Sequence, residues 1–304
     1  MKIFIHQDSL YGDKWHERYH HLLSQRYGLK TVVVDFLKVP LDEICGLVAR
    51  GDGLIGRWGH ADGDFGTFST LVDAVWTLFG GRVFPAPHTY LYYNDKARQA
   101  SLFANRGYPT PATAFVHSIS ELEAFINREQ LDLPIVIKDK RGTQSRNVRL
   151  LLRMADATFP CIAQQFCPGN SHDYRVCVIG HRVMGFARLN RKNDFRASGS
   201  HNIIHAERLE CDIVQLASRI SVDNRFESMA YDIIRLGHKC VVLEMSYTYP
   251  HWSLRDCQSY YDTRLGCYVS KDGVYPEDFI VEDFISSYYP DLIRRQFREH
   301  TLPL

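Results

Sequence analysis

The sequence lacks the features that mark membrane, secreted and nucleic-acid-binding proteins. No stretch approaches the roughly 18 consecutive apolar residues that a transmembrane helix requires. The formal net charge of +1 gives neither a global basic field for nucleic acid nor an acidic tail. The opening residues, M-K-I-F-I-H-Q-D-S, contain no apolar segment and no cleavage site typical of a secretory signal. We therefore expect no membrane span and no nucleic-acid partner.

Paired cysteines are also lacking. The eight cysteines are scattered singly through 304 residues, without a C-x-x-C pair or a regular series of spacings. Disulfide frameworks and zinc ribbons both show such spacings. The pattern therefore indicates reduced thiols and a cytoplasmic protein, and the length is sufficient for two or three packed lobes. No feature of the sequence indicates an oligomeric state.

The first part of the chain alternates between strand-like and helical patterns. The predicted strands are Lys2–His6, Thr31–Phe36 and Gly53–Ile55. Helical patterns lie between them, at Lys14–Tyr27 and Leu41–Ala49. Alternation with short links predicts a small α/β layer with a parallel sheet.

Polar side chains follow two of these strands, where ligands gather in parallel sheets. They are His6, Asp8, Ser9, Arg57, Trp58 and His60. A substrate-binding role is one interpretation of this set. The alternative is a set of ordinary polar loops.

The same region contains an H-E-x-x-H motif. His16, Glu17 and His20 have the spacing with which two histidines on one helical face bind zinc beside a glutamate base. The surrounding residues are those of an exposed helix, and no third ligand follows in the sequence. A surface helix is therefore favoured over a zinc hydrolase.

Two capped helices precede the most informative stretch. Asn94 or Asp95 is expected to cap the first helix, and Ser120 with Glu123 fits a capping box for the second. The stretch Pro134–Leu152 then predicts a strand, a polar loop and a second strand. Lys138 ends the first strand, where its ammonium can meet phosphate oxygens while loop N–H groups surround them. An ordinary hairpin with a solvated basic tip is the alternative.

Two carboxylates lie on adjacent apolar strands that a Gly237-His238 turn connects. Asp232 is within one strand, and Glu244 follows Val241-Val242-Leu243 in the next. Buried carboxylates are costly unless they are paired or bind a metal, and Mg²⁺ is typically held by one or two carboxylates plus substrate phosphates. The alternative is a structural acid that pairs with Arg235 or Lys239.

The order of these parts resembles the ATP-grasp carboxylate–amine ligases, nearest the RimK-like branch that modifies ribosomal proteins. The resemblance covers about residues 94–250, and the first 90 residues match only in kind. The matching pieces are Asp95-Lys96, Pro109–Thr113, Lys138 with Gly142–Val148, Ala163–Phe166, Asp173-Tyr174-Arg175, Arg188, Arg196, Asp232 and Leu243–Ser246.

The resemblance implies an α/β fold with α+β lobes: an N-terminal Rossmann-like pre-ATP-grasp domain (1–90), a central lobe with the phosphate loop (91–160) and a C-terminal lobe with the metal site and a helical tail (161–304). It also implies roles for individual residues. Arg188 and Arg196 would meet the transferred phosphoryl group, and Asp173 would hold the ribose. ATP would contact Lys96, Lys138, Gly142, Thr143, Gln144, Ser145, Gln164, Gln165 and Phe166. Mg²⁺, or Mn²⁺, would be held by Asp232, Glu244 and Ser246.

The chain departs from the family pattern at several positions. Ser145 and Asn147 replace further glycines of the loop, Gln165 replaces an acidic residue, and Ser246 replaces an asparagine. The loop is also similar to that of ATP-grasp proteins encoded among bacterial surface-polysaccharide genes.

The predicted function is ATP-dependent amide formation through an acyl phosphate, with a sugar acid, amino acid or peptide as substrate. The alternative from another class is an ATP-binding or ATP-sensing protein without turnover, and the third is the zinc hydrolase. No convincing Ser–His–Asp or Cys–His set is found.

Overall fold

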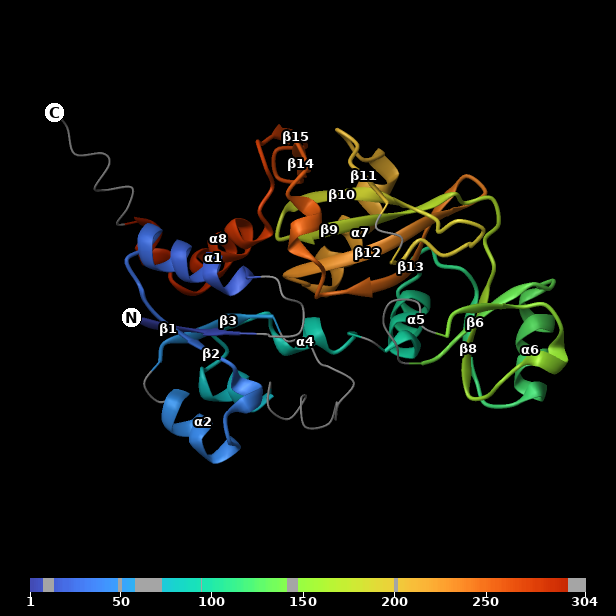
Figure 1. The fold of residues 1–304 in the computed structure, drawn as a ribbon, viewed down its shortest axis with the longest axis horizontal. Helices are drawn as coiled ribbons and strands as arrows, with labels where there is room; N and C mark the ends of the chain where they lie inside the picture. The colour runs from blue at the N-terminus through green and yellow to red at the C-terminus, as the bar shows by residue number, and fades with distance from the viewer. Residues whose placement is uncertain are drawn as a thin grey trace.

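The computed structural model describes residues 1–7, 14–48, 51–57, 73–93, 95–140, 147–199 and 202–294. Three sheets organise these residues, and the N-terminal sheet lies at one end of the molecule and a small central lobe at the other (Figure 1). The largest sheet lies between them (Figure 1). Among the described helices, none is long and apolar enough to cross a membrane.

The N-terminal sheet is parallel throughout, with strand order β2-β1-β3-β4. Its strands are β1 (Lys2–His6), β2 (Lys30–Val34), β3 (Gly53–Gly56) and β4 (Val83–Phe84). The helices of this lobe include α1 (Trp15–His21), continued by η1 (Leu22–Arg26), and α2 (Leu41–Val48), with the short α4 (Pro87–Tyr90) after β4. Residues 73–78, before β4, are also helical. The predicted parallel α/β layer is confirmed. The second strand ends at Val34 rather than Phe36, because residues Phe36–Lys38 form a 3-10 turn.

The central lobe is an antiparallel sheet with strand order β5-β8-β6-β7, covered by one helix. Its elements are β5 (Thr113–Val116), α6 (Ile119–Glu129), β6 (Ile135–Lys138), β7 (Arg149–Leu151) and β8 (Cys161–Gln165). The two strands of the predicted strand–loop–strand are thus present as β6 and β7, and residues 141–146 between them lie outside the described residues. The predicted boundary between residues 160 and 161 falls just before β8, the strand between β5 and β6, so this sheet extends past it.

Helix caps account for the starts of α5 (Lys96–Asn105) and α6. Asp95 caps α5, and its side chain accepts a hydrogen bond from the Arg98 amide (3.1 Å). The predicted box of Ser120 and Glu123 is wrong. Ser118 caps α6 instead, accepting from the Glu121 amide (3.3 Å), since the chain is extended only up to Ser118.

The C-terminal sheet is seven-stranded, with path β13-β12-β9-β10-β14-β15 and β11 beside β10. Its strands are β9 (His172–Ile179), β10 (Arg182–Leu189), β11 (Ile203–Ile204), β12 (Ser228–Leu236), β13 (Lys239–Ser246), β14 (Ser259–Asp262) and β15 (Cys267–Ser270). Helix α7 (Cys211–Asn224) packs its apolar residues against this sheet. The predicted turn at Gly237 joins β12 and β13, and its φ of 59° is one that glycine adopts without strain.

The C-terminal helix α8 (Pro276–Tyr288) packs against α1 of the N-terminal lobe, as Figure 1 shows. Arg18 pairs with Asp278 (2.7 Å) and Arg26 with Glu282 (2.9 Å). The apolar core here contains residues of the N-terminal lobe, of β9, β10 and β12, and of α8. The central lobe has a core of its own. The helical tail expected for the C-terminal lobe is present as α8, and a second helical segment follows at 290–294; the residues after 294 lie outside the described residues.

Candidate active site

A cavity of about 440 Å³ is lined by residues of the central and C-terminal sheets and by Arg57, which directly follows β3 of the N-terminal sheet. Each predicted site residue that the structure describes lines this cavity. They are Lys96, Lys138, Gln164, Gln165, Phe166, Asp173, Arg188, Arg196, Asp232, Glu244 and Ser246. Gly142, Thr143, Gln144 and Ser145 lie outside the described residues.

Two buried lysines enter the cavity from different elements. Lys138 ends β6, and its Nζ donates to Gln164 Oε1 (3.0 Å). Burial is the main reason that the pKa of Lys138 falls to about 8, partly opposed by Glu244. Lys96 begins α5, and its Nζ lies 3.5 Å from Glu244 Oε1. Two ammonium groups at one cavity wall provide charge for a polyanionic ligand.

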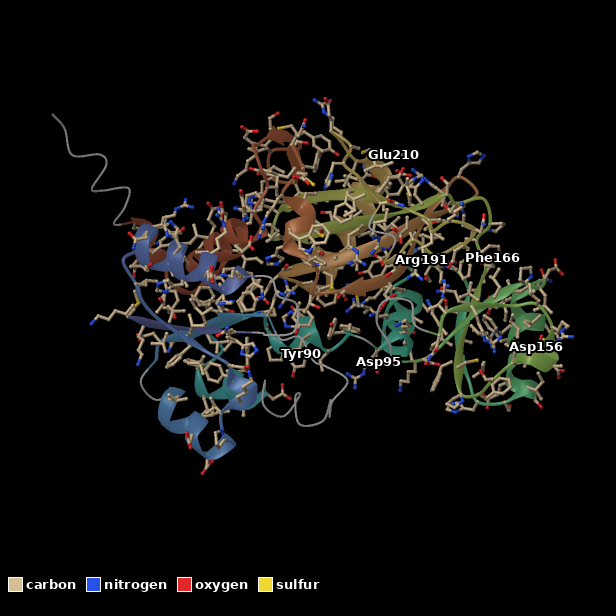
Figure 2. The ribbon with its side chains drawn as sticks, in the orientation of Figure 1. Tyr90, Asp95, Asp156, Phe166, Arg191 and Glu210 are labelled. Atoms are coloured by element: carbon tan, nitrogen blue, oxygen red, sulfur yellow. The ribbon has the colours of Figure 1, made fainter. Side chains whose placement is uncertain are left out.

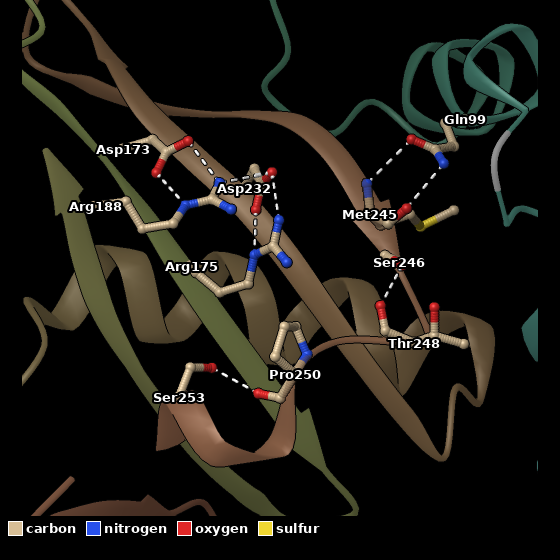
Figure 3. Close-up of polar contacts among 10 residues, drawn as sticks. All are labelled: Gln99, Asp173, Arg175, Arg188, Asp232, Met245, Ser246, Thr248, Pro250 and Ser253. Atoms are coloured by element: carbon tan, nitrogen blue, oxygen red, sulfur yellow. Dashed lines mark hydrogen bonds and ion pairs between the residues drawn. The ribbon is translucent and has the colours of Figure 1, made fainter. Parts of the chain in front are cut away.

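Helix α5 is fixed to the C-terminal sheet by a side-chain amide. Gln99 Nε2 donates to the Met245 carbonyl (2.8 Å), and Gln99 Oε1 accepts from the Met245 amide (3.0 Å), as Figure 3 shows. This pair of bonds mimics the pairing of a strand neighbour and places Lys96 beside β13.

The end of β8 leads from the central lobe to the cavity. Gln164 is buried, and its Nε2 donates to Thr113 Oγ1 (2.9 Å). The Gln165 amide donates to the Ala112 carbonyl (2.8 Å), so that N–H already has a partner within the sheet. Phe166 lies where the central lobe meets the C-terminal sheet (Figure 2), with its ring edge-on to Phe195 (5.7 Å). That Gln164, Gln165 and Phe166 contact ATP stays a prediction.

Strand register brings an acidic and basic network onto one face of the C-terminal sheet. Arg188 of β10 lies opposite Asp173 of β9, and Asp232 of β12 lies opposite Arg175 of β9. Asp173 and Arg175 share a face because side chains alternate along a strand. Cross-strand opposite charges stabilise such pairs. The register therefore explains why all four side chains meet (Figure 3).

The network is bidentate at both carboxylates. Arg188 donates to both oxygens of Asp173 (2.8 and 2.7 Å), and Arg175 donates to both oxygens of Asp232 (2.7 and 2.9 Å). Arg188 Nη2 also lies 2.8 Å from Asp232 Oδ2. Burial disfavours the charged Asp232, but the two guanidinium groups outweigh it and lower its pKa to about 2.

These contacts change the expected partners of both acids. The partners expected for Asp232 as a structural acid, Arg235 or Lys239, are wrong: Asp232 pairs with Arg175 and Arg188. Arg235 contacts Asp212 and Glu210 instead. A structural role for Asp232 stays the alternative to a metal ligand. Asp173, expected to hold a ribose, has both oxygens bonded to Arg188.

The residues predicted to hold the metal lie on neighbouring strands. Glu244 of β13 is directly opposite Asp232 of β12, and Ser246 is opposite Ala230. Glu244 and Ser246 are two residues apart on one strand, so their side chains share a face, and both line the cavity. The Ser246 hydroxyl donates to the Thr248 carbonyl (2.6 Å). Within the described ranges, no group of three His, Cys, Asp or Glu side chains could hold a metal alone. Two adjacent carboxylates nevertheless fit a Mg²⁺ ion whose other ligands are phosphate and water.

Arg196 lies in the loop after β10 and bonds to the backbone just before β7. It pairs with Asp194 (2.7 Å), and its Nη1 donates to the Val148 carbonyl (3.0 Å), directly after the predicted phosphate loop. Arg196 thus lines the cavity as predicted, and the carboxylate of Asp194 neutralises its charge.

The polar set of the N-terminal lobe is divided by the structure. Arg57 is buried, lines the cavity and donates to the Tyr249 carbonyl (2.9 Å). His6 lies within the lobe and accepts from the Phe36 amide (3.2 Å), and burial lowers its pKa to about 4. Asp8, Ser9, Trp58 and His60 lie outside the described residues.

The H-E-x-x-H residues lie on α1, packed against α8 and away from the cavity. Glu17 pairs with Lys14 (3.0 Å), and His20 Nδ1 contacts Thr31 Oγ1. Burial lowers the pKa of His16. The absence of zinc at this helix stays a prediction for metal analysis.

Several cavity residues have no role that could be predicted from the sequence. Arg175 was noted only as part of a motif, although its period-two spacing from Asp173 could have placed it on the same face. The apolar wall comes from Val136, Val148, Ile234 and Leu243, which carry no signal beyond strand hydrophobicity. Trp252, which is 46% exposed, lines the cavity from the segment after Ser246.

Comparison with solved structures defines the class of fold, which is ATP-grasp. The chain is similar to a RimK domain ATP-grasp protein from Sphaerobacter thermophilus DSM 20745, at 15% identity and a TM-score of 0.66, over 93% of this chain and 99% of that one. It is similar to the D-cycloserine synthetase DcsG, at 15% identity and a TM-score of 0.66, over 93% and 100%. It also resembles the ATP-grasp ligase PsnB in complex with a minimal precursor, Mg and ADP, at 16% identity and a TM-score of 0.62, over 94% and 98%.

Comparison of the sequence with models of protein families identifies the family of this chain. The RimK-like ATP-grasp domain matches residues 93–250, just over half of the chain, and the protein therefore belongs to this family. No curated protein matches the chain. The looser resemblance to polysaccharide-associated proteins finds no support in these comparisons.

Proposed function

We propose that the protein is an ATP-dependent carboxylate–amine ligase. The observation that carries this proposal is one cavity in which Lys96 and Lys138 lie near the carboxylate pair Asp232 and Glu244. Family membership and the structure of PsnB with Mg and ADP support nucleotide and metal use.

In the proposed reaction, a carboxylate oxygen of the acid attacks the γ-phosphorus of ATP, and the bond to the bridging β-γ oxygen breaks to release ADP. The amine nitrogen then attacks the acyl carbon, and phosphate leaves with its bonding electron pair. The amine gives up its proton to solvent or phosphate. No side-chain nucleophile is needed, so the chain acts by orientation and by charge.

The lysines, two of the arginines and the carboxylate pair have separate roles in this scheme. Lys96 and Lys138 hold nucleotide phosphates. Arg188 and Arg196 neutralise the transferred phosphoryl group. Mg²⁺ or Mn²⁺, held by Asp232, Glu244 and Ser246, would neutralise phosphate charge as it develops.

We place the acid at the end of the cavity formed by the N-terminal lobe and the segment after Ser246. Arg57 brings a guanidinium to this end, and Trp252 and Ser253 line it. A guanidinium suits a carboxylate, and a half-exposed indole suits a flat apolar group. PsnB was solved with the precursor peptide PsnA2. A peptide is therefore a substrate to test alongside sugar acids and amino acids.

The second candidate is an ATP-binding protein without turnover. The observation that favours it is the hydrogen bond from the Ser246 hydroxyl to the Thr248 carbonyl. This bond competes with the use of Ser246 as a metal ligand. Ligand-dependent ADP release separates the two candidates.

The test is a screen for amine-dependent release of ADP and phosphate across sugar acids, amino acids and peptides, with Lys138→Ala as the key variant. We expect Lys138→Ala to abolish nucleotide binding or turnover, because the variant lacks a charge-assisted phosphate contact. Lys239→Ala is the matched control, since Lys239 is exposed at the start of β13. Full activity and unchanged ATP affinity in Lys138→Ala would refute the proposal.

A further inference from the structure

The carboxylate of Asp232 is occupied by arginine. It accepts from Arg175 Nε (2.7 Å) and Arg175 Nη2 (2.9 Å), and Arg188 Nη2 lies 2.8 Å from Oδ2 (Figure 3). Asp232 and the two arginines are largely buried. A divalent cation would need an oxygen of this same carboxylate.

Glu244, the other acid on this face, also has a cationic neighbour, Lys96, at 3.5 Å. A bare divalent ion that enters the site would therefore meet fixed positive charges beside each of its acidic ligands. Mg²⁺ also requires near-octahedral oxygen ligands and gives up its waters reluctantly. Before phosphate oxygens are present, the positive charges are not screened and the octahedral set of oxygen ligands is incomplete.

A bound nucleotide would both draw the arginines away from Asp232 and supply oxygen ligands for the metal. Arg175 and Arg188 line the cavity, and a guanidinium binds phosphate oxygens with the same bidentate geometry as it binds a carboxylate. Phosphates that attract the guanidinium groups leave Asp232 available and supply the remaining oxygen ligands. Repulsion between arginine and metal is then screened by the phosphate charge between them.

We propose that Arg175 and Arg188 make divalent-metal binding depend on nucleotide, with Arg175 as a positioning residue that holds Asp232 until phosphate arrives. This inference rests on the proposed use of ATP and metal. Arg175 is the informative residue because Arg188 also holds Asp173. Removal of Arg175 leaves Asp232 with one arginine partner and leaves the Arg188–Asp173 pair intact.

The experiment measures binding of Mn²⁺ to the full chain, by the electron paramagnetic resonance signal of free Mn²⁺ and by equilibrium dialysis. Each protein is titrated alone and with a saturating, non-hydrolysable ATP analogue, and a titration of the analogue without protein is subtracted, because the analogue itself chelates Mn²⁺. Arg175→Gln is the test variant, and Arg188→Gln is the second should the first fail to fold. Arg235→Gln is the matched control, because Arg235 is on β12 but contacts Glu210 and Asp212. Circular dichroism and thermal melting verify folding.

We expect the wild-type protein to bind Mn²⁺ roughly 10- to 100-fold more weakly without the analogue than with it. In Arg175→Gln, affinity for Mn²⁺ alone should rise by about tenfold, and the dependence on nucleotide should shrink accordingly. Arg235→Gln should behave as wild type. A merely structural arginine would not increase metal affinity when removed.

Two results would overturn the inference. One is stoichiometric Mn²⁺ binding by wild type with equal affinity in the presence and absence of the analogue. The other is a folded Arg175→Gln protein whose affinity for Mn²⁺ alone is unchanged. Failure of the proposed function is distinct, because the analogue would then not bind to any of the proteins, as isothermal titration without metal would show.

Discussion

Replacement of Lys138 by methionine should make the protein more stable near neutral pH while it eliminates nucleotide binding. The lysine is only 8% exposed, and burial lowers its pKa from 10.5 to about 8. A buried ammonium without a phosphate partner therefore opposes folding. Methionine has a similar length, no charge and flexible packing.

The magnitude follows from the two pKa values. A fall from 10.5 to about 8 corresponds to a penalty of about 3 kcal/mol for the charged lysine in the folded state. Loss of the Lys138–Gln164 hydrogen bond leaves a buried amide oxygen and costs roughly 1–2 kcal/mol. We therefore expect Lys138→Met to increase the free energy of unfolding by about 1–2 kcal/mol near pH 7.

The pH dependence separates the two contributions. Below about pH 8 the lysine is protonated in both folded and unfolded protein, so the full penalty is present. Above that pH the folded state loses its proton first, and wild-type stability rises until about pH 10.5. The advantage of the variant should thus decrease by about 3 kcal/mol across this window, whereas the hydrogen-bond contribution stays constant.

The assay is urea unfolding of wild type, Lys138→Met and the exposed control Lys239→Met at several pH values between about 7 and 10.5, followed through tryptophan fluorescence. Isothermal titration with ATP accompanies it. A stability difference between wild type and Lys138→Met that is independent of pH would show that the buried lysine carries no such penalty. Retained ATP binding in the variant would refute its role as a phosphate contact.

Three further predictions concern the metal side, the H-E-x-x-H helix and the acid end of the cavity. Ser246→Asn should lower the Mg²⁺ concentration needed for half-maximal ADP release, because an amide oxygen reaches further than a hydroxyl, whereas Glu244→Gln should raise it steeply; unchanged Mg²⁺ dependence in both variants would make these residues structural. His16→Ala and His20→Ala should lose no stoichiometric zinc, as elemental analysis of the purified proteins would show, and one equivalent released by either change would restore the zinc hypothesis. Arg57→Met should raise the KM for the acid by about tenfold without change in the KM for ATP, and the reverse pattern in initial-rate kinetics would place Arg57 elsewhere.

The sequence was sufficient for those parts of the fold that depend on local periodicity and turns. The alternation that ends at Gly53–Gly56 predicted the parallel sheet, and Gly237 predicted the pairing of β12 with β13. The cap of α6 was misplaced by two residues because Ser118 and Ser120 are chemically equivalent candidates, and only the backbone distinguishes them.

Partners across strands could not be predicted in the same way. Arg175 and Asp232 are 57 residues apart, and their contact depends on the register between β9 and β12. Sequence spacing indicates which residues share a face of one strand, but not which residue of another strand lies opposite. Asp232 does line the cavity with the other predicted site residues, but its partners were predicted incorrectly, and Arg175 was left without a role.

The apolar core beneath α8 is shared by the N-terminal lobe and the C-terminal sheet. Because α8 and three strands of the C-terminal sheet pack into one core with the N-terminal lobe, these parts should behave as a single rigid frame. The central lobe has its own core and is joined to the frame by the extended segment before β5 and by the segment after β8. Entry and exit of ligands would then be a hinge motion of the central lobe alone. Lys138 would travel with that lobe, while Asp232 and Glu244 stay fixed, so closure would itself bring the phosphate contact to the carboxylates.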